Sequence, residues 1–209
     1  MTFVDRLKEG KKQIIVTYGT CFSADNVRSN PWVIIFQKEL DKLFPELVKI
    51  LIKGQGAMNS NWGVNNLKER VLENNPNIVF LEFAANDAKE DKGGEMSGLP
   101  LQKSVQNLDN IIKTIKNNNS NCEVYIWTTM PITTKGRDKT INKYFEQYRI
   151  YCKENNYKLL DLYTIFYKLK KEDEKTYWLC VTEDEGHVTR YGTKKVIMPL
   201  LKDVFNYEI

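Results

Sequence analysis

Residues 14–26, IIVTYGTCFSADN, set the fold class of the chain. The stretch begins with β-branched and aromatic residues that are typical of a buried strand, and it breaks at Gly19. Small polar or nucleophilic side chains follow at Thr20, Cys21 and Ser23, ahead of residues that resemble the start of a helix. Many α/β proteins present a reactive atom in this way, on a sharp turn between a strand and a helix. The stretch therefore predicts a strand that leads into a functional turn.

The rest of the chain alternates between two kinds of segment. Short, nearly continuous apolar runs rich in Val, Ile and aromatic residues have the composition of strands buried on both faces of a parallel sheet. These runs cover residues 13–18, 47–52, 77–84, 122–129 and 157–162. Stretches with the apolar spacing of amphipathic helices cover residues 32–44, 63–75, 101–119, 139–156 and 190–205. Pro199 should kink or shorten the last of these helices, because proline lacks a backbone N–H.

This alternation predicts the fold class. Strands that alternate with helices form βαβ units with right-handed crossovers, and these build a three-layer αβα sandwich around a five-stranded parallel sheet. No internal repeat or linker interrupts residues 1–209, so one domain is expected, with residues 89–100 as its most loop-like segment. Ligands of such sheets bind outside the carboxyl ends of the strands. Candidate site residues should therefore follow the strands.

The composition is that of a folded, soluble protein. Of 209 residues, 42% are hydrophobic and 28% are charged, and the net charge of +4 comes from lysines spread through the chain. No cluster of arginine and aromatic residues is present, so no nucleic-acid partner is expected. The N-terminus lacks the pattern of a signal peptide, and no apolar run approaches the ~20 residues that span a membrane. We therefore expect a cytoplasmic protein with no membrane partner.

The cysteine and glycine patterns bear on metals and cofactors. Cys21, Cys122, Cys152 and Cys180 are widely separated and form no CxxC pair, which argues against a zinc site and a disulfide framework. Residues 54–56, GQG, begin a dinucleotide fingerprint but lack its final glycine and follow the second predicted strand. No metal and no cofactor are therefore expected.

His187, the single histidine of the chain, is the candidate general base. Asp184 precedes it by three residues, a spacing at which two side chains on a turn can face the same way. A carboxylate in that place can hold one ring nitrogen, so that the other nitrogen points outward as a base. The alternative is an ordinary surface or core histidine, which is the commoner role for a lone one.

Polar residues and glycines follow two further strands. Asn86 and Asp87 stand where the chain must leave the third strand, and Asn86 could donate its amide to a developing oxyanion. The alternative for this pair is a polar turn or a helix cap. After the second strand, residues 54–57, GQGA, are free to bring backbone N–H groups close to a ligand.

Together these four segments resemble the SGNH (GDSL-like) hydrolase family. Members carry a nucleophilic serine in a G-D-S block, a backbone donor from a later glycine, an asparagine in G-x-N-D, and an acid and a base in D-x-x-H. Here GTCFS, KGQGAMNS, AAND and DEGH occur in that order over nearly the full chain, and the Y-G-T start resembles a subset that reads Y-G-T-S. The resemblance implies a flavodoxin-like α/β fold and an acyl ester hydrolase.

The resemblance also implies a role for each matching residue. Cys21 falls on the nucleophile, His187 on the base and Asp184 on the acid that orients the base. The N–H groups of Cys21 and Ala57 and the side chain of Asn86 would form the oxyanion hole.

The match is imperfect at the glycines and at the nucleophile. Ala57 aligns with the glycine of the second block, with Gly56 one residue away, and its methyl group narrows the approach to its N–H. Ala84 replaces the glycine of the third block. Cys21 stands where the family has serine, which leaves three readings open: a native thiolate nucleophile, a cysteine put in place of serine, or a protein that binds without cleaving.

The resemblance to the Y-G-T-S subset implies a small-molecule or carbohydrate acyl ester as substrate, with O-acetyl groups on carbohydrate as one candidate. Trp62, close to the second block, could stack on a sugar face, although most aromatic residues at such spacings pack the core. A thiol-dependent acyltransferase and a non-catalytic binding protein for acylated carbohydrate are the alternatives. A native thiolate would need its pKa lowered by a neighbouring imidazole and by a helix N-terminus just after Cys21.

Overall fold

The structure is a computed structural model. It describes residues 2–24, 31–90, 94–133 and 138–207.

A parallel sheet forms the centre of the molecule, as the alternating pattern predicts. In the described part of the chain its strands are β1 (Gln13–Gly19), β2 (Val48–Ile52), β3 (Ile78–Glu82), β4 (Glu123–Thr128) and β5 (Lys158–Asp161). They lie in the order β2-β1-β3-β4-β5, and each neighbouring pair is parallel. This is the flavodoxin-like order. The strand order reverses its direction across the sheet between β1 and β3, while all strands remain parallel. The predicted five-stranded α/β fold is confirmed.

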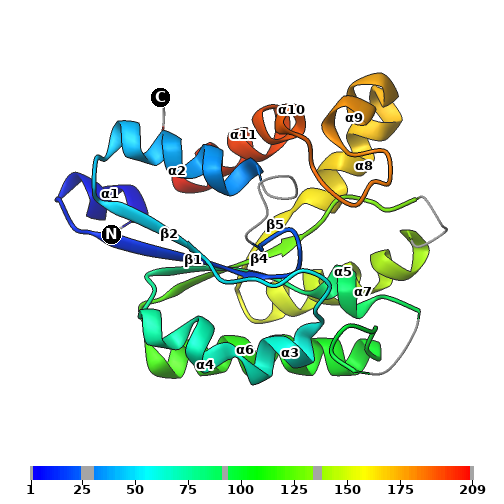
Figure 1. The fold of residues 1–209 in the computed structure, drawn as a ribbon, viewed down its shortest axis with the longest axis horizontal. Helices are drawn as coiled ribbons and strands as arrows, with labels where there is room; N and C mark the ends of the chain where they lie inside the picture. The colour runs from blue at the N-terminus through cyan, green and yellow to red at the C-terminus, as the bar shows by residue number, and fades with distance from the viewer. Residues whose placement is uncertain (1, 25–30, 91–93, 134–137, 208–209) are drawn as a thin grey trace.

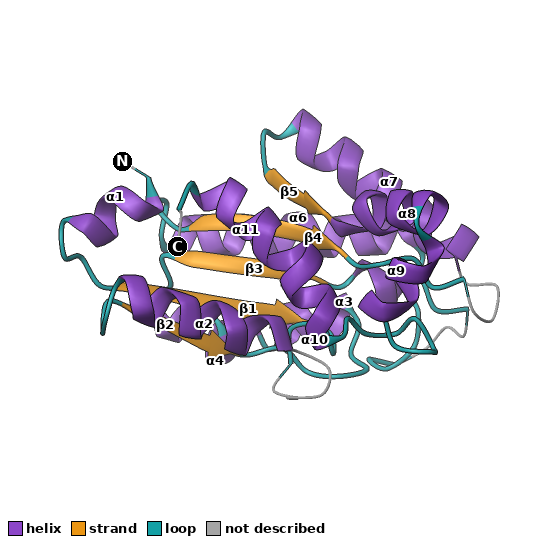
Figure 2. Ribbon diagram, turned by 90° about the horizontal axis from the view of Figure 1, so that it is seen from above, coloured by secondary structure: helices purple, strands orange, loops and turns teal. Residues whose placement is uncertain are grey.

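Helices cover both faces of the sheet (Figures 1 and 2). One layer contains α1 (Phe3–Lys8), α2 (Pro31–Leu43), α8 (Leu162–Glu172), α9 (Glu174–Cys180), α10 (Arg190–Gly192), the π-helical turn η3 (Thr193–Ile197) and α11 (Met198–Phe205). The other contains α3 (Ser60–Asn65), α4 (Leu67–Arg70), η1 (Leu72–Asn74), α5 (Ala84–Asp87), α6 (Leu101–Asn118) and α7 (Asp138–Glu154).

Strand side chains alternate between two apolar cores, one under each helical layer. Ile15 and Phe80 join the core beneath α2 and α11, whereas Val16 and Leu81 join the core beneath α6 and α7. Every residue of β3 is buried, because both of its faces are covered. This two-sided burial explains why four of the five residues of β3, Ile78 to Leu81, are apolar.

Several helices differ from the sequence prediction. The expected helix over residues 63–75 is broken into α3, α4 and η1, and it begins earlier because Asn59 caps α3 by accepting from the N–H of Asn61. The last helix is interrupted as expected around Pro199, with η3 before α11. The apolar spacing of the sequence did not predict the helices α1, α8 and α9. The expected loop at 89–100 lies partly outside the described residues, and its described part is irregular.

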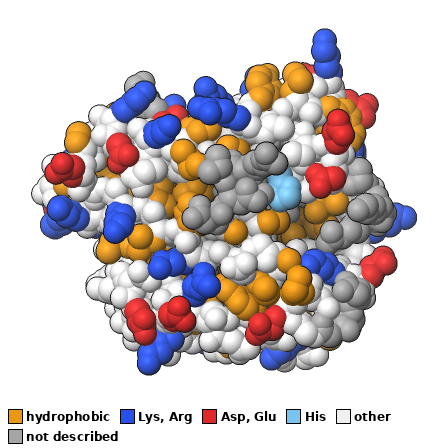
Figure 3. All heavy atoms as spheres, viewed as in Figure 1, with side chains coloured by type: hydrophobic (Ala, Val, Ile, Leu, Met, Phe, Trp, Pro, Cys, Tyr) orange, Lys and Arg blue, Asp and Glu red, His pale blue; other side chains and the backbone are white. Residues whose placement is uncertain are grey.

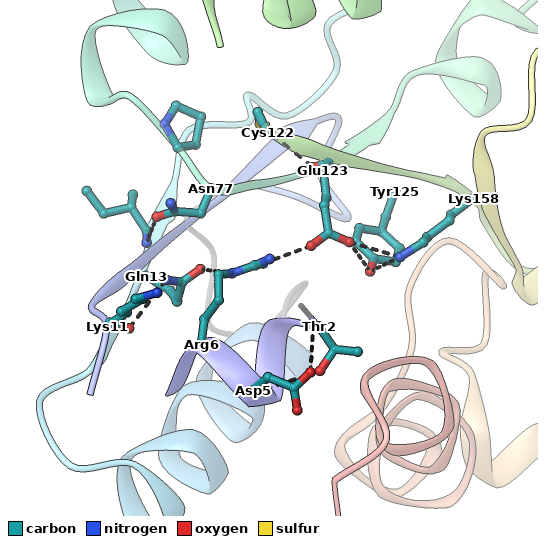
Figure 4. Close-up of polar contacts among 12 residues, drawn as sticks. Thr2, Asp5, Arg6, Lys11, Gln13, Asn77, Cys122, Glu123, Tyr125 and Lys158 are labelled. Carbon is teal, nitrogen blue, oxygen red and sulfur yellow. Dashed lines mark hydrogen bonds and ion pairs between the residues drawn. The ribbon is translucent and has the colours of Figure 1, made fainter. Parts of the chain in front are cut away.

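The amino ends of the strands are fastened by a charged network (Figure 4). Arg6 of α1 donates to Gln13 at 2.8 Å and to Glu123 at 2.8 Å, which ties α1 to β1 and β4. Lys158 of β5 donates to the same carboxylate at 2.9 Å and to Tyr125 at 2.8 Å.

Among the helices that the structure describes, none has the length and apolar character of a membrane span.

Candidate active site

The candidate site lies where β1, β2 and β3 end side by side. The loop after β2 follows the turn after β1, because the N–H of Gln55 donates to the carbonyl oxygen of Gly19 at 2.9 Å and Gly54 forms a parallel bridge with Ala24. The two segments approach so closely that a Cβ atom on Gly54 would lie 2.6 Å from the carbonyl oxygen of Ser23. Only glycine fits at that contact.

Cys21 is half-buried in the turn that follows β1. A Cβ atom placed on Gly56 would lie 3.9 Å from the Cβ of Cys21, so the two candidate blocks meet at this side chain. The described residues after Cys21 form a turn, and the next described helix, α2, begins only at Pro31. The helix N-terminus expected directly after Cys21 is therefore absent from residues 21–24, and residues 25–30 lie outside the described part.

The environment of Cys21 favours the neutral thiol. Burial raises the pKa of the Cys21 thiol, and the nearby carboxyl group of Glu82 raises it further, while Lys89 acts in the opposite direction. This direction is opposite to the one expected for a thiolate held by an imidazolium. A resting thiolate is thus disfavoured in this structure, and attack by sulfur would require removal of the thiol proton.

Ala57 has the backbone of a glycine position. Its φ of 69° lies in the left-handed region, which costs an alanine about 1–2 kcal/mol. Its carbonyl oxygen accepts a hydrogen bond from Nζ of Lys89 at 3.0 Å, and the same ammonium group donates to the carbonyl of Met96 at 2.8 Å. Lys89 therefore fixes the orientation of this loop. A left-handed backbone of this kind is one that glycine adopts without strain.

Asn86 is held against the same loop. It lies in the single turn of α5, and its Nδ2 donates to the carbonyl oxygen of Met58 at 2.9 Å. A carboxamide has two N–H hydrogens, so one remains for a further acceptor. The neighbouring Asp87 accepts from the N–H of Ser60 at 2.8 Å and so fastens the start of α3 to α5. Together these contacts fix the position of Asn86 relative to Ala57.

Asp184 and His187 lie in the loop between α9 and α10. Val181 and Val188 pair as an antiparallel bridge across the base of the loop. Thr182 connects the two candidate residues of the loop. The Thr182 hydroxyl donates to Asp184 at 2.6 Å and accepts from the N–H of His187 at 3.1 Å. The Thr182 hydroxyl and the N–H of Gly186 lower the pKa of Asp184, which keeps this carboxylate ionised.

Nε2 of His187 is buried and has no hydrogen-bond partner among the described residues. The single histidine is visible on the face seen in Figure 1, beside hydrophobic side chains (Figure 3). The structure thus brings Cys21, the Gly56–Ala57 turn and Asn86 together, but it forms no hydrogen bond between Cys21 and His187. The triad assignment remains a prediction.

Trp62 does not have the surroundings of a substrate-stacking residue. Its side chain is 6% exposed and packs in α3 against Tyr18 and Phe83, with ring-centre distances of 5.7 and 6.4 Å. The guanidinium group of Arg70 lies 5.3 Å from its ring centre. Little of the indole is left for a ligand, so Trp62 is a core residue, contrary to the expected substrate contact.

Two buried carboxyl groups near the site were not singled out from the sequence. Glu82 ends β3 beside the Cys21 turn, and its charge within an apolar run was the available signal. Glu185 lies between Asp184 and His187, has no exposed surface and accepts from Tyr177 at 2.6 Å and Lys170 at 2.7 Å. Among the described residues, no group of three or more His, Cys, Asp or Glu side chains could hold a metal ion.

The fold and the placement of these blocks define a flavodoxin-like α/β protein with its candidate site at the carboxyl ends of β1, β2 and β3. The sequence model of the GDSL-like lipase/acylhydrolase family matches residues 16–192. The chain therefore belongs to this family, as the resemblance implied.

Solved structures with the same fold are consistent with this family. An acetylxylan esterase from Geobacillus stearothermophilus superposes with a TM-score of 0.77 at 16% identity, over 95% of this chain and 96% of that one. The acetyl xylan esterase AlAXEase gives a TM-score of 0.77 at 20% identity, over 91% and 99%. A lipase/acylhydrolase from Enterococcus faecalis gives 0.74 at 19% identity, over 93% and 96%. Among curated proteins, none matches the sequence.

Proposed function

We propose that the chain hydrolyses acyl esters, with Cys21 as the attacking residue, His187 as the base and Asp184 as the residue that orients it. The contact between the Cys21 turn and the Gly56–Ala57 turn supports this proposal, because it brings the candidate nucleophile close to candidate oxyanion donors. Asn86, held through the carbonyl of Met58, supplies the third donor.

The reaction follows from these roles. His187 removes the thiol proton as sulfur attacks the ester carbonyl, and the oxyanion receives hydrogen bonds from the N–H groups of Cys21 and Ala57 and from Asn86. The C–O bond then breaks, the alcohol leaves with the proton from His187, and an acyl-thioenzyme remains. Water, deprotonated by the same imidazole, attacks the acyl carbon, the C–S bond breaks, the carboxylic acid leaves, and His187 returns its proton to the sulfur.

The proposed substrate is a short acyl ester, with acetyl groups on carbohydrate as the first candidate. The support is that two proteins of the same fold are acetylxylan esterases by name. Transfer of the acyl group to an alcohol acceptor is the alternative in which the same intermediate forms. Binding of acylated carbohydrate without cleavage is the alternative in which Cys21 never reacts.

Hydrolysis of 4-nitrophenyl acetate and release of acetate from acetylated xylooligosaccharides test the proposal. We expect both reactions with the unaltered chain and their loss in His187→Ala, because neutral thiol attack depends on a base. Lys11→Ala, an exposed change at the amino ends of the strands, serves as the control and should leave both rates unchanged. Absence of turnover on either substrate, with binding of the xylooligosaccharide intact, would favour the binding protein.

A further inference from the structure

Glu82 is packed directly against the strand end that leads to Cys21. It lies opposite Gly19 in the register of β1 and β3. Its side chain is 1% exposed, and a Cβ atom on Gly19 would lie 2.4 Å from Oε1 of Glu82. The glycine is therefore required for the carboxyl group to occupy this place.

The carboxyl group of Glu82 binds both polar groups of Thr20, the residue before Cys21. Oε1 accepts from the N–H of Thr20 at 2.6 Å, and the Thr20 hydroxyl lies 2.8 Å from Oε2 and 3.0 Å from Oε1. No lysine or arginine forms an ion pair with Glu82 in the described part of the chain. The conformation of the turn that carries Cys21 thus depends on one buried acid for which the described residues provide no counter-ion.

Burial without a cation determines the charge of this acid. Burial raises the pKa of Glu82 to about 8, and the nearby Asp87 acts in the same direction, whereas the hydrogen bonds from Thr20 and the nearby Ser23 side chain lower it. Tyr148 of α7 also faces Glu82, and burial keeps the pKa of that phenol far above its ordinary value, so it stays neutral. Glu82 is therefore protonated at neutral pH and loses its proton in mild alkali.

We propose that Glu82 is a positioning residue for the nucleophile turn: it fixes Thr20, and the charge that it gains on losing its proton opposes ionisation of the Cys21 thiol. The charged groups that act on the thiol are Glu82 and, in the opposite direction, Lys89. The inference rests on the proposed function only in taking Cys21 as the attacking residue.

A titratable acid beside a thiol couples the two ionisations, so the observed pKa values belong to the pair. Below about pH 8 Glu82 is neutral and adds no charge to the site. Above that pH its negative charge makes removal of the Cys21 proton harder. The thiolate should therefore form over a broader pH range than a single ionisation would give.

Glu82→Gln tests this coupling, since glutamine keeps the shape and an acceptor for the N–H of Thr20 but carries no charge. The rate of alkylation of Cys21 by iodoacetamide is measured from pH 6 to about pH 10 by mass spectrometry of the peptide that contains it. We expect the apparent pKa of Cys21 to fall in Glu82→Gln, with alkylation at pH 9 rising by about tenfold for each unit lost. Glu123→Gln, a partly buried carboxyl at the other end of the sheet, should leave the profile unchanged.

The same pH profile for Glu82→Gln and the unaltered protein would overturn the proposal. If Glu82→Gln does not fold, the unaltered protein still decides: its alkylation profile should need two coupled ionisations, and a one-proton curve would refute the coupling. Alkylation requires no ester, so a shifted profile in a protein without esterase activity would preserve this inference while rejecting the proposed function.

Discussion

At the scale of a single residue, Cys21 raises the question of whether the site suits sulfur or oxygen. Burial raises the pKa of the Cys21 thiol, so the ion pair that a thiol enzyme uses before substrate arrives is disfavoured, and the Glu82 carboxyl raises this pKa further once it has lost its proton. A serine needs no such pair, because its proton is removed during attack. The surroundings of Cys21 therefore resemble those of a hydroxyl nucleophile.

Cys21→Ser should accordingly increase hydrolysis of short nitrophenyl esters, by about 10² or more in kcat. Asn86→Ala in the serine background should then lower kcat by about 10²–10³, the cost of removing one oxyanion donor. Steady-state rates on 4-nitrophenyl acetate give both values. A native thiol enzyme would behave in the opposite way, with activity lost in Cys21→Ser and an acyl group trapped on Cys21 in the unaltered chain.

At the scale of the elements, the loop that carries His187 is fastened by an ion pair to a fully buried carboxylate. Glu185 accepts from Lys170 of α8 at 2.7 Å and from Tyr177 of α9 at 2.6 Å, and it is fully buried with a left-handed φ of 53°. The N–H and hydroxyl of Thr133 also donate to this carboxylate. The loop is thus tied to α8, to α9 and to the segment that follows β4.

Lys170→Met should destabilise the protein by about 3–5 kcal/mol, because it removes a cation that is paired with the fully buried Glu185 carboxylate. Arg6→Met is the matched control: the Arg6–Glu123 pair has a similar N–O distance of 2.8 Å, but Glu123 is 24% exposed and keeps Lys158. Its loss should cost about 1 kcal/mol or less. Urea unfolding of the two variants compares these costs. Equal losses of unfolding free energy would show that the burial of Glu185 adds no cost to removing its cation.

These elements also show what a sequence can predict. The strands and the helices α2 and α6 follow from local apolar periodicity, which is present in each segment by itself. The break at Asn66, between α3 and α4, is not visible in that periodicity. The anchoring of Glu185 depends on Lys170 and Tyr177, and the pairing of Glu82 with Thr20 joins residues 62 positions apart. Contacts of this kind arise from the tertiary fold, so the sequence names candidate block residues but not the side chains that hold them in place.

At the scale of the whole molecule, buried carboxyl groups shape the dependence of stability on pH. Burial raises the pKa of Asp161, but the hydrogen bonds from Arg149, Thr164 and Thr128 and the charge of Arg149 together outweigh it and lower the pKa below its ordinary 3.8. The contribution of Asp161 to stability is therefore present above that pH and is lost as the pH falls through the lowered value. Glu82 acts in the opposite sense, because burial raises its pKa from 4.5 to about 8. Between pH 4.5 and about pH 8 the folded state keeps a proton on Glu82 that the unfolded state has released, so stability falls as the pH rises.

The free energy of unfolding should therefore be highest near pH 5 and should decline toward about pH 8, above which Glu82 is ionised in both states. The decline due to Glu82 is on the order of 4 kcal/mol, since each pKa unit corresponds to about 1.4 kcal/mol. Glu82→Gln should remove most of this slope, whereas Glu123→Gln should retain it, because Arg6 and Lys158 outweigh burial and hold the pKa of Glu123 below its ordinary value. Urea unfolding at intervals between pH 5 and 9 measures the slope. A stability that is level over this range in the unaltered protein, and unchanged in slope by Glu82→Gln, would mean that Glu82 is ionised at neutral pH and that its charge is balanced within the fold.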